Sequence, residues 1–216
     1  MRVLLALLAL SIAAWPQVAG EANRRYQTKE GRERMAAGLG SSSRDKTQKP
    51  EEIVAALDLR PGMTVADVGT GVGYMLPFLS KAVGASGKIL AEDIQADFLE
   101  KVKAKIASDN LSNVTLILGA ENDPKLPSGS VDVALVLDSY HHFDYPEKML
   151  AALAKSLKPD GRLAIVEFYQ ATGPQPGHIR LDRDDFVREI EGHGFRLLSK
   201  NDRITDRQYL LIFGRK

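Results

Sequence analysis

One stretch, Val-Ala-Asp-Val-Gly-Thr-Gly-Val-Gly-Tyr at residues 65–74, constrains the fold of this chain more than any other. An apolar run that carries Asp67 leads into Gly69, Gly71 and Gly73, and an apolar helical pattern follows. Such a sequence predicts a strand, a tight turn and a helix. Glycine suits this turn because it accepts backbone conformations that other residues avoid. The missing side chain also lets a ligand approach the main chain.

The spacing of these glycines separates the turn from the dinucleotide-binding pattern. A dinucleotide fold carries G-x-G-x-x-G after its first strand, whereas this chain has G-x-G-x-G and then Tyr74. The spacing therefore counts against an NAD-dependent oxidoreductase.

Asp67 and the glycine turn together resemble the first motif of class I S-adenosylmethionine-dependent methyltransferases. In that family the loop passes under the amino-acid end of the cofactor, and the acidic residue helps to hold the cofactor's ammonium group. The resemblance implies S-adenosyl-L-methionine as the cofactor. The binding residues it implies in this stretch are Asp67, Gly69, Thr70, Gly71, Gly73 and Tyr74.

The composition is that of an ordinary globular chain. Its 216 residues are 44% hydrophobic and 26% charged, and the formal net charge is +1. This balance gives no electrostatic argument for nucleic-acid binding. Because the chain contains no cysteine, it has no disulfides, thiolate metal ligands or cysteine nucleophile.

Residues 1–20 have the layout of a secretory signal peptide. Arg2 precedes an apolar run at 3–14, Trp15-Pro16 ends that run, and small residues at 18–20 offer a cleavage site. We therefore expect export to the periplasm, with no membrane attachment of the mature chain. The alternatives are a cytoplasmic chain, or a chain tethered by an uncleaved N-terminal segment.

Residues 21–50 are polar and precede the first motif. They are expected to form an N-terminal arm or a cofactor lid, with a short helix at 30–37. In methyltransferases of this type the corresponding segment often folds over the cofactor, and Tyr26, Arg44 and Gln48 are the candidates for this here. A solvated arm is the alternative.

Beyond residue 50 the chain alternates between helical and strand patterns. Helical repeats are expected at 51–59, 74–83, 95–108, 146–157 and 182–192. Apolar, β-branched runs predict strands at 64–68, 88–92, 114–118, 131–137, 162–168, 195–200 and 207–213. The alternation predicts a parallel sheet with right-handed crossovers.

The end of the chain departs from this alternation, because the last two predicted strands follow each other without a long crossover. They are expected to form an antiparallel hairpin at the sheet edge. The resemblance implies the corresponding fold: an α/β, Rossmann-like three-layer sandwich with a mostly parallel seven-stranded sheet and an antiparallel C-terminal strand. Residues 51–216 are expected to form this methyltransferase domain.

Ligands of open α/β sheets bind beyond the carboxyl ends of the strands, so the residues after each strand are the candidates. Asp93 follows the second strand, about 20 residues after the glycine turn, as a strand–helix–strand unit requires. A carboxylate there accepts hydrogen bonds from both ribose hydroxyls. Asp93 matches the family's ribose acid and Ile94 its adenine-stacking residue, while Glu92 competes for the ribose role.

After the third strand, many relatives carry Gly-Asp-Ala, with the aspartate reaching the adenine amino group. This chain has Ala120 in that position and Glu121 next to it. The departure makes Glu121 the expected adenine contact, with Asn122 or Asp123 as the alternatives.

After the fourth strand, the segment 138–143 resembles the L-x-x-x-H-H segment that lies between cofactor and acceptor in small-molecule methyltransferases. Asp138 is expected to contact the cofactor. His141 or His142 is the candidate general base, because imidazole titrates near neutrality. Adjacent histidines after a strand are expected to point to opposite sides, so that at most one faces the site. No third ligand stands at a recognisable spacing, so no metal site is expected.

Two further segments complete the resemblance. The Leu-Lys-Pro-Asp-Gly sequence at 157–161 resembles a structural turn before the fifth strand of the family. The loop at 173–180 is rich in glycine and proline and is expected at the rim of the site. His178 and Arg180 in this loop are either contacts for an anionic acceptor or, preferably, solvated residues.

These features predict an S-adenosylmethionine-dependent methyltransferase of the UbiE-like, small-molecule type, which moves a methyl group by in-line transfer. Positioning the acceptor atom behind the methyl carbon supplies most of the acceleration of such a reaction. No inserted substrate domain is recognisable, which counts against a nucleic-acid or protein acceptor. The alternative is a catalytically silent cofactor-binding or regulatory module with the same fold. Neither the acceptor nor the oligomeric state follows from the sequence.

Overall fold

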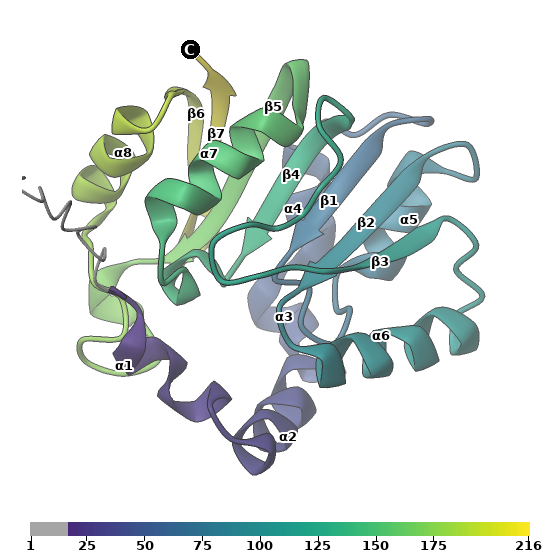
Figure 1. The fold of residues 1–216 in the computed structure, drawn as a ribbon, viewed down its shortest axis with the longest axis horizontal. Coiled ribbons are helices and arrows are strands. Elements are labelled where there is room, and N and C mark those ends of the chain that lie inside the picture. The colour runs from purple at the N-terminus through teal and green to yellow at the C-terminus, as the bar shows by residue number, and fades with distance from the viewer. Residues whose placement is uncertain (1–16) are drawn as a thin grey trace, which may run out of the picture.

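The computed structural model describes residues 17–216, except for the side chains of residues 203–205. Its centre is a seven-stranded sheet in the order β3-β2-β1-β4-β5-β7-β6 (Figure 1). The strands are β1 (Thr64–Val68), β2 (Lys88–Asp93), β3 (Val114–Leu118), β4 (Val131–Leu137), β5 (Leu157–Phe168), β6 (Phe195–Thr205) and β7 (Gln208–Arg215). Most of the predicted leader lies outside the described residues.

The strand directions confirm the predicted mixed sheet. β1 to β5 run parallel to one another. β7 pairs antiparallel with both β5 and β6, with Phe213 opposite Leu163 on one side and Leu197 on the other. The last two strands therefore form the predicted edge hairpin, and β7 is the antiparallel strand.

Helices cover both faces of the sheet and make the three layers seen in Figure 1. On one face, α4 (Pro50–Ala56), α5 (Leu76–Val83) and α6 (Ala96–Ser108) share a buried core with the strands. On the other face, α7 (Pro146–Ser156) and α8 (Arg183–Gly192) pack through side chains such as Leu153 and Phe186. Burying each such side chain contributes about 1.5–3 kcal/mol, so two apolar layers hold the glycine turn in place.

The N-terminal segment crosses the carboxyl ends of the parallel strands rather than joining either helical layer (Figure 1). It contains α1 (Gly20–Asn23), η1 (Arg24–Tyr26), α2 (Lys29–Leu39), η2 (Ser42–Arg44) and α3 (Asp45–Gln48). Thr28 caps α2 by accepting a hydrogen bond from the backbone N–H of Gly31. The predicted helix at 30–37 is thus present and slightly longer.

One boundary prediction is wrong. Residues 158–161 were expected to form a turn before a strand at 162, but β5 begins at Leu157. Leu157 pairs with Val131, and the pairing resumes at Arg162 with Val133 after a register shift. The turn residues are therefore an irregularity inside a strand.

Within residues 17–216, no helix is long and apolar enough to cross a membrane.

Candidate functional site

The glycine turn has the tight backbone geometry that the sequence predicts. Gly69, Gly71 and Gly73 have φ angles of 70°, 58° and 80°, which side chains disfavour. A Cβ atom on Gly69 would lie 2.7 Å from Cβ of Ser139, so this position also needs glycine for space. After β1 the main chain therefore turns beneath a cavity that lies at the carboxyl ends of the parallel strands.

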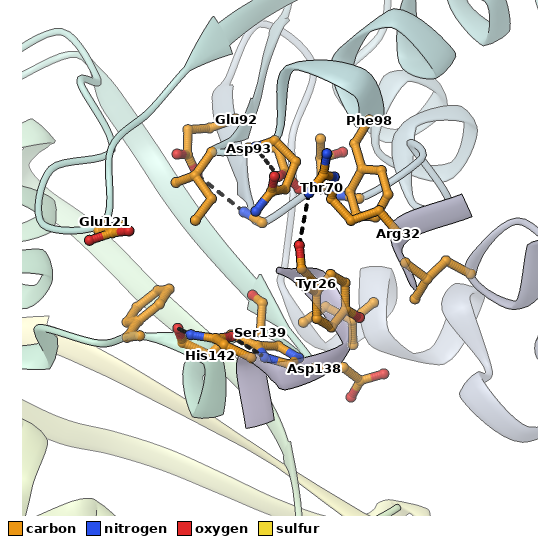
Figure 2. Close-up of a pocket in the computed structure, with 18 of the residues that line it drawn as sticks. Tyr26, Arg32, Thr70, Glu92, Asp93, Phe98, Glu121, Asp138, Ser139 and His142 are labelled. Atoms are coloured by element: carbon orange, nitrogen blue, oxygen red, sulfur yellow. Dashed lines mark hydrogen bonds between the residues drawn. The ribbon is translucent and has the colours of Figure 1, made fainter. Parts of the chain in front are cut away.

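A pocket of about 400 Å³ opens at this turn, at the carboxyl ends of the parallel strands. Figure 2 shows Thr70, Glu92 and Asp93 on one side of the pocket and Asp138, Ser139 and His142 across from them. Of the predicted site residues, the lining includes Asp67, Gly69, Thr70, Gly71, Tyr74, Asp93, Ile94, Ala120, Glu121, Asp138 and His142. Gly73 and His141 are outside it.

Asp67 lies at the floor of the pocket. Its side chain is buried, and it accepts a hydrogen bond of 2.7 Å from the Thr70 hydroxyl. Burial raises the pKa of Asp67 to about 6, although the Thr70 hydrogen bond opposes the shift. A carboxylate buried without a cationic partner in contact is suited to holding an ammonium group.

The two acids at the end of β2 differ in their surroundings. Asp93 accepts hydrogen bonds from the backbone N–H groups of Gly71 and Gln95, over 2.9 and 2.8 Å. Glu92 accepts one bond from the N–H of Gly69 over 3.2 Å. Its other oxygen, Oε1, is buried without a partner among the described residues. Burial raises the pKa of Asp93 to about 6 and that of Glu92 to about 8.

The predicted adenine contacts lie at the open end of the pocket. Ile94 is 42% exposed and lines the pocket, so its apolar side chain is free to pack against a flat ligand. Ala120 and Glu121 line the same region, whereas Asn122 and Asp123 do not. Ala120 is held by a backbone bridge to Asp123, so the bend that brings Glu121 to the pocket is part of the fold.

Asp138 connects the tip of β4 to the N-terminal segment. It has a left-handed backbone conformation, with φ 52°, and its carboxylate accepts a bond of 3.0 Å from Arg44 and another from Gln208. Burial raises the pKa of Asp138 to about 7, and Arg44 opposes that shift. The guanidinium of Arg44 also lies 4.3 Å from the centre of the Tyr74 ring.

The N-terminal segment covers the pocket. Tyr26 lies between its two walls (Figure 2), and its ring meets that of His142 edge-on at 4.8 Å between centroids. Arg32 donates to the backbone oxygen of Tyr26 and pairs with Asp97 of α6. Tyr26 and Arg44 therefore line the site as expected, while Gln48 lies behind it and donates to Gln208.

Sequence reasoning missed several lining residues: Asn23, Arg32, Phe98, Ser139, Phe143, Asp144 and Met149. Phe98 lies in the predicted helix at 95–108, where an apolar repeat alone does not separate a pocket residue from a core residue. Asn23 and Arg32 carry no local signal, because they reach the pocket through contacts with residues far away in the chain, such as His142 and Asp97.

The two adjacent histidines do not point to opposite sides, which corrects the expectation. They occupy a short turn of 3-10 helix, η3 (Tyr140–His142), and their ring centroids are 4.2 Å apart. Successive side chains of a 3-10 helix are about 120° apart, rather than on opposite faces as in a strand, so the two rings can approach each other. His142 lines the pocket, and His141 lies behind it against Glu167, with 2.9 Å between Nδ1 and the carboxylate.

The two rings have opposite electrostatic environments. Burial and the neighbouring His141 and His178 hold the pKa of His142 well below its usual value. Burial alone would lower the pKa of His141 as well, but the Glu167 carboxylate outweighs it, so that this pKa is raised. Near neutral pH, His142 is therefore a neutral imidazole at the pocket wall.

The charges of the lining fit the cofactor that the sequence implies. Six acidic side chains line the pocket against two arginines, and both arginines already contact carboxylates. S-Adenosylmethionine carries a sulfonium and an ammonium, so it supplies positive charge beside the buried Asp67, Glu92 and Asp93, which have no ion-pair partner among the described residues. The turn at Gly69 and Gly71 carries no side chains and therefore leaves room for a ligand beside the main chain.

Comparison with known proteins points to the same family. A methyltransferase-domain model matches residues 65–161. The crystal structure of a SAM-dependent methyltransferase from Aquifex aeolicus is 30% identical in sequence and superimposes with a TM-score of 0.79. That match covers 83% of this chain and 96% of the Aquifex chain.

Curated relatives match over a shorter region. Nocamycin O-methyltransferase of Saccharothrix syringae is 34% identical over 56% of this chain, and the match covers 41% of that protein. The ubiquinone/menaquinone biosynthesis C-methyltransferase UbiE of Paraburkholderia phymatum is 28% identical over 56% of this chain and 49% of its own length. The matches thus span less than half of these curated relatives. With the near-complete match to the Aquifex structure, they show that the chain belongs to the class I S-adenosylmethionine-dependent methyltransferases.

Proposed function

We propose that this chain transfers a methyl group from S-adenosylmethionine to a small-molecule acceptor by in-line displacement. The observation that carries the proposal is the acid-lined pocket at the glycine turn, with a neutral histidine on the opposite wall. When bound, the cofactor supplies an electrophilic methyl group on a positively charged sulfur. The remaining roles belong to residues of the chain.

Asp67 and the turn at Gly69–Gly71 bind the amino-acid end of the cofactor in this proposal. Asp93 binds the ribose hydroxyls, and Ile94, Ala120 and Glu121 surround the adenine. All of these residues line the pocket, which supports the assignments. Asp138 lies on the opposite wall beside Ser139 (Figure 2), where it borders both cofactor and acceptor.

His142 is the residue proposed to receive a proton from the acceptor where the acceptor must lose one. Its Nδ1 donates to the side-chain oxygen of Asn23 over 2.8 Å, because an amide oxygen only accepts. Nε2 therefore keeps a lone pair, as a general base requires. Tyr26 and Arg44 cover the pocket and restrict water.

A small acceptor is proposed on two grounds. The pocket holds about 400 Å³ and is covered by the N-terminal segment, which leaves limited room beside the cofactor. The two named curated relatives act, by their names, on nocamycin and in ubiquinone and menaquinone biosynthesis. All three named compounds are small molecules.

Export remains a proposal supported by the N-terminal sequence. Arg2, the apolar run at 3–14 and the small residues at 18–20 have the layout of a cleaved leader. A periplasmic location is therefore proposed for the mature chain. Because S-adenosylmethionine is synthesised in the cytosol, a periplasmic enzyme needs a supply of it in that compartment.

Two measurements test the activity. Calorimetry with S-adenosylmethionine and S-adenosylhomocysteine should show binding to one site that Asp67→Asn weakens. Formation of S-adenosylhomocysteine should then be followed with acceptors that offer oxygen, carbon, nitrogen, sulfur or arsenic nucleophiles. Binding without turnover on any of them would favour the silent binding module. No binding of either molecule would contradict both functions.

A further inference from the structure

Three of the four histidines of the chain meet at one point beside the pocket. His141 and His142 come from η3 after β4, and His178 comes from the loop that follows β5. The centroid of the His178 ring lies 4.8 Å from that of His141 and 5.8 Å from that of His142. One potential ligand nitrogen from each ring lies within 4.8 Å of the other two.

Nδ1 of two of these rings is held by a hydrogen bond, which leaves Nε2 as the candidate metal ligand. Nδ1 of His141 lies 2.9 and 3.0 Å from the two oxygens of Glu167, whose side chain is 1% exposed. Nδ1 of His142 donates to Asn23. Metal-binding histidines have this arrangement, because a carboxylate or amide oxygen on one nitrogen orients the ring and leaves the other nitrogen for the metal.

We propose that His141, His142 and His178 form a binding site for a divalent transition metal of the Zn²⁺ type. A metal ion placed among the three rings accepts one nitrogen lone pair from each of them. Imidazole nitrogens suit Zn²⁺, Co²⁺ and Ni²⁺. The buried carboxylate of Glu167 compensates part of the charge of the ion.

Binding requires a modest contraction of the cluster. Zn–N bonds of about 2.0–2.1 Å in a tetrahedral site place the ligand nitrogens roughly 3.3 Å apart. His178 is the ligand able to move, since its loop contains Gly173 and Gly177, and Gly177 has open space around its Cα atom. Its ring is also less buried than the other two.

Three protein ligands leave a fourth position open, as in catalytic zinc sites. His142 also lines the pocket, so the metal would border the acceptor side. One consequence rests on the proposed function: with a metal bound, His142 would be a ligand and could not accept a proton, so an acceptor hydroxyl bound to the ion would release its proton to solvent water instead. Metal binding itself does not depend on methyl transfer.

The test is a titration of the metal-free chain, purified without a histidine tag, with Co²⁺ and then with Zn²⁺. One equivalent of Co²⁺ should produce the visible absorption of a tetrahedral site, and Zn²⁺ should displace it. His178→Ala should abolish this absorption, as should His141→Ala and His142→Ala. Glu167→Gln should weaken binding roughly 10–100-fold, as loss of such a carboxylate does.

His193, the remaining histidine of the chain, provides the matched control. It lies at the C-terminal end of α8, where its Nδ1 donates to the backbone oxygen of Glu189, and it does not belong to the cluster. His193→Ala should bind Co²⁺ like the unmodified chain. Absence of the absorption in the unmodified chain, or unchanged binding by a folded His178→Ala variant, would overturn the proposal. His178→Ala is decisive because its loop position makes misfolding a small risk, which circular dichroism checks.

S-Adenosylmethionine calorimetry on the same samples separates this site from the proposed activity. Metal binding without cofactor binding would support the metal site and contradict the methyltransferase proposal. Cofactor binding without any metal binding would overturn the metal site and leave the methyltransferase proposal standing.

Discussion

Nδ1 of His142 donates a hydrogen bond to the side-chain oxygen of Asn23, with 2.8 Å between the two atoms. Nδ2 of Asn23 donates in turn to the backbone oxygen of His142 and to the carboxylate of Asp144. A residue of the N-terminal segment thus determines the tautomer of a pocket histidine that follows it by more than half of the chain.

This hydrogen bond predicts the tautomer of His142 in the metal-free protein, and the lowered pKa predicts its charge. Because burial and two neighbouring histidines lower its pKa, the ring should be neutral at pH 6.5, with the proton on Nδ1. ¹⁵N NMR of the histidine side chains, recorded with a chelator present, measures both properties. Asn23→Ala should give a mixture of tautomers, and Asn122→Ala, outside the pocket, should leave the spectrum unchanged. A charged ring or a proton on Nε2 would contradict the assignment.

The acid that binds the ribose should be Asp93 rather than Glu92. Oε1 of Glu92 is turned toward Gly119, where a Cβ atom would lie only 1.8 Å away, whereas Asp93 lies beside the glycine turn. Asp93→Ala should raise the Kd for S-adenosylmethionine roughly 10–100-fold, the loss expected for hydrogen bonds to a charged group. Glu92→Ala should raise it much less, and the exposed Asp160→Ala should not change it. Calorimetry decides, and the reverse ranking would refute the ribose assignment.

Stability of the free protein should fall as the pH rises from about 4 to 8. Unfolded carboxyl groups lose their protons near pH 4, but in the folded chain burial raises the pKa of Asp67 to about 6 and that of Glu92 to about 8. Between these values the folded state binds more protons than the unfolded state, and its stability therefore decreases with pH. Thermal melts at several pH values, with cofactor absent, measure the effect.

Affinity for S-adenosylmethionine should change in the opposite direction, increasing from pH 5.5 to pH 8. A cation favours ionised carboxylates, so binding should release protons, which calorimetry detects in buffers of different ionisation enthalpy. S-Adenosylhomocysteine lacks the sulfonium charge and serves as the control, with a weaker pH dependence. An affinity for the methylated cofactor that stays constant or falls over this range would contradict the charge argument.

The ion pair between Arg44 and Asp138 should stabilise the packing of the N-terminal segment over the pocket. The two side chains are 20% and 13% exposed and 3.0 Å apart, so removing one partner leaves a partly buried charge. Arg44→Met should cost roughly 2–3 kcal/mol, somewhat below the range for fully buried pairs. Adding Asp138→Asn should restore part of that loss, whereas Arg34→Met, on an exposed side chain, should cost little. Denaturant unfolding measures these values, and additive losses in the double variant would argue against the coupling.

If the chain is exported as proposed, the mature protein should begin near Glu21. Cleavage there removes Val18 and Ala19, whose backbone N–H groups donate to Asp144, but it keeps Asn23 and its bond to His142. N-terminal sequencing of the periplasmic fraction is the measurement. A start at Met1 in the cytosolic fraction would remove the export proposal.

The sequence alone determined most of the scaffold. The alternation of patterns predicted the parallel sheet and its hairpin ending, because apolar periodicity reflects burial on one or both faces of an element. The turn at Gly69–Gly73 was equally readable, since only glycine adopts these φ angles without strain. Acids directly after strands, such as Asp93, were predictable for the same local reason: strand ends meet at one edge of the sheet.

Tertiary structure decided what surrounds that edge. No local pattern indicated that Asn23 would orient His142, that Arg44 would pair with Asp138, or that His178 would join the two adjacent histidines. Each of these contacts joins residues far apart in the chain, so it depends on how the N-terminal segment and the loop after β5 fold back over the strands. Local sequence encodes backbone conformation and burial, whereas the partners of a polar side chain are set by the packing of distant segments.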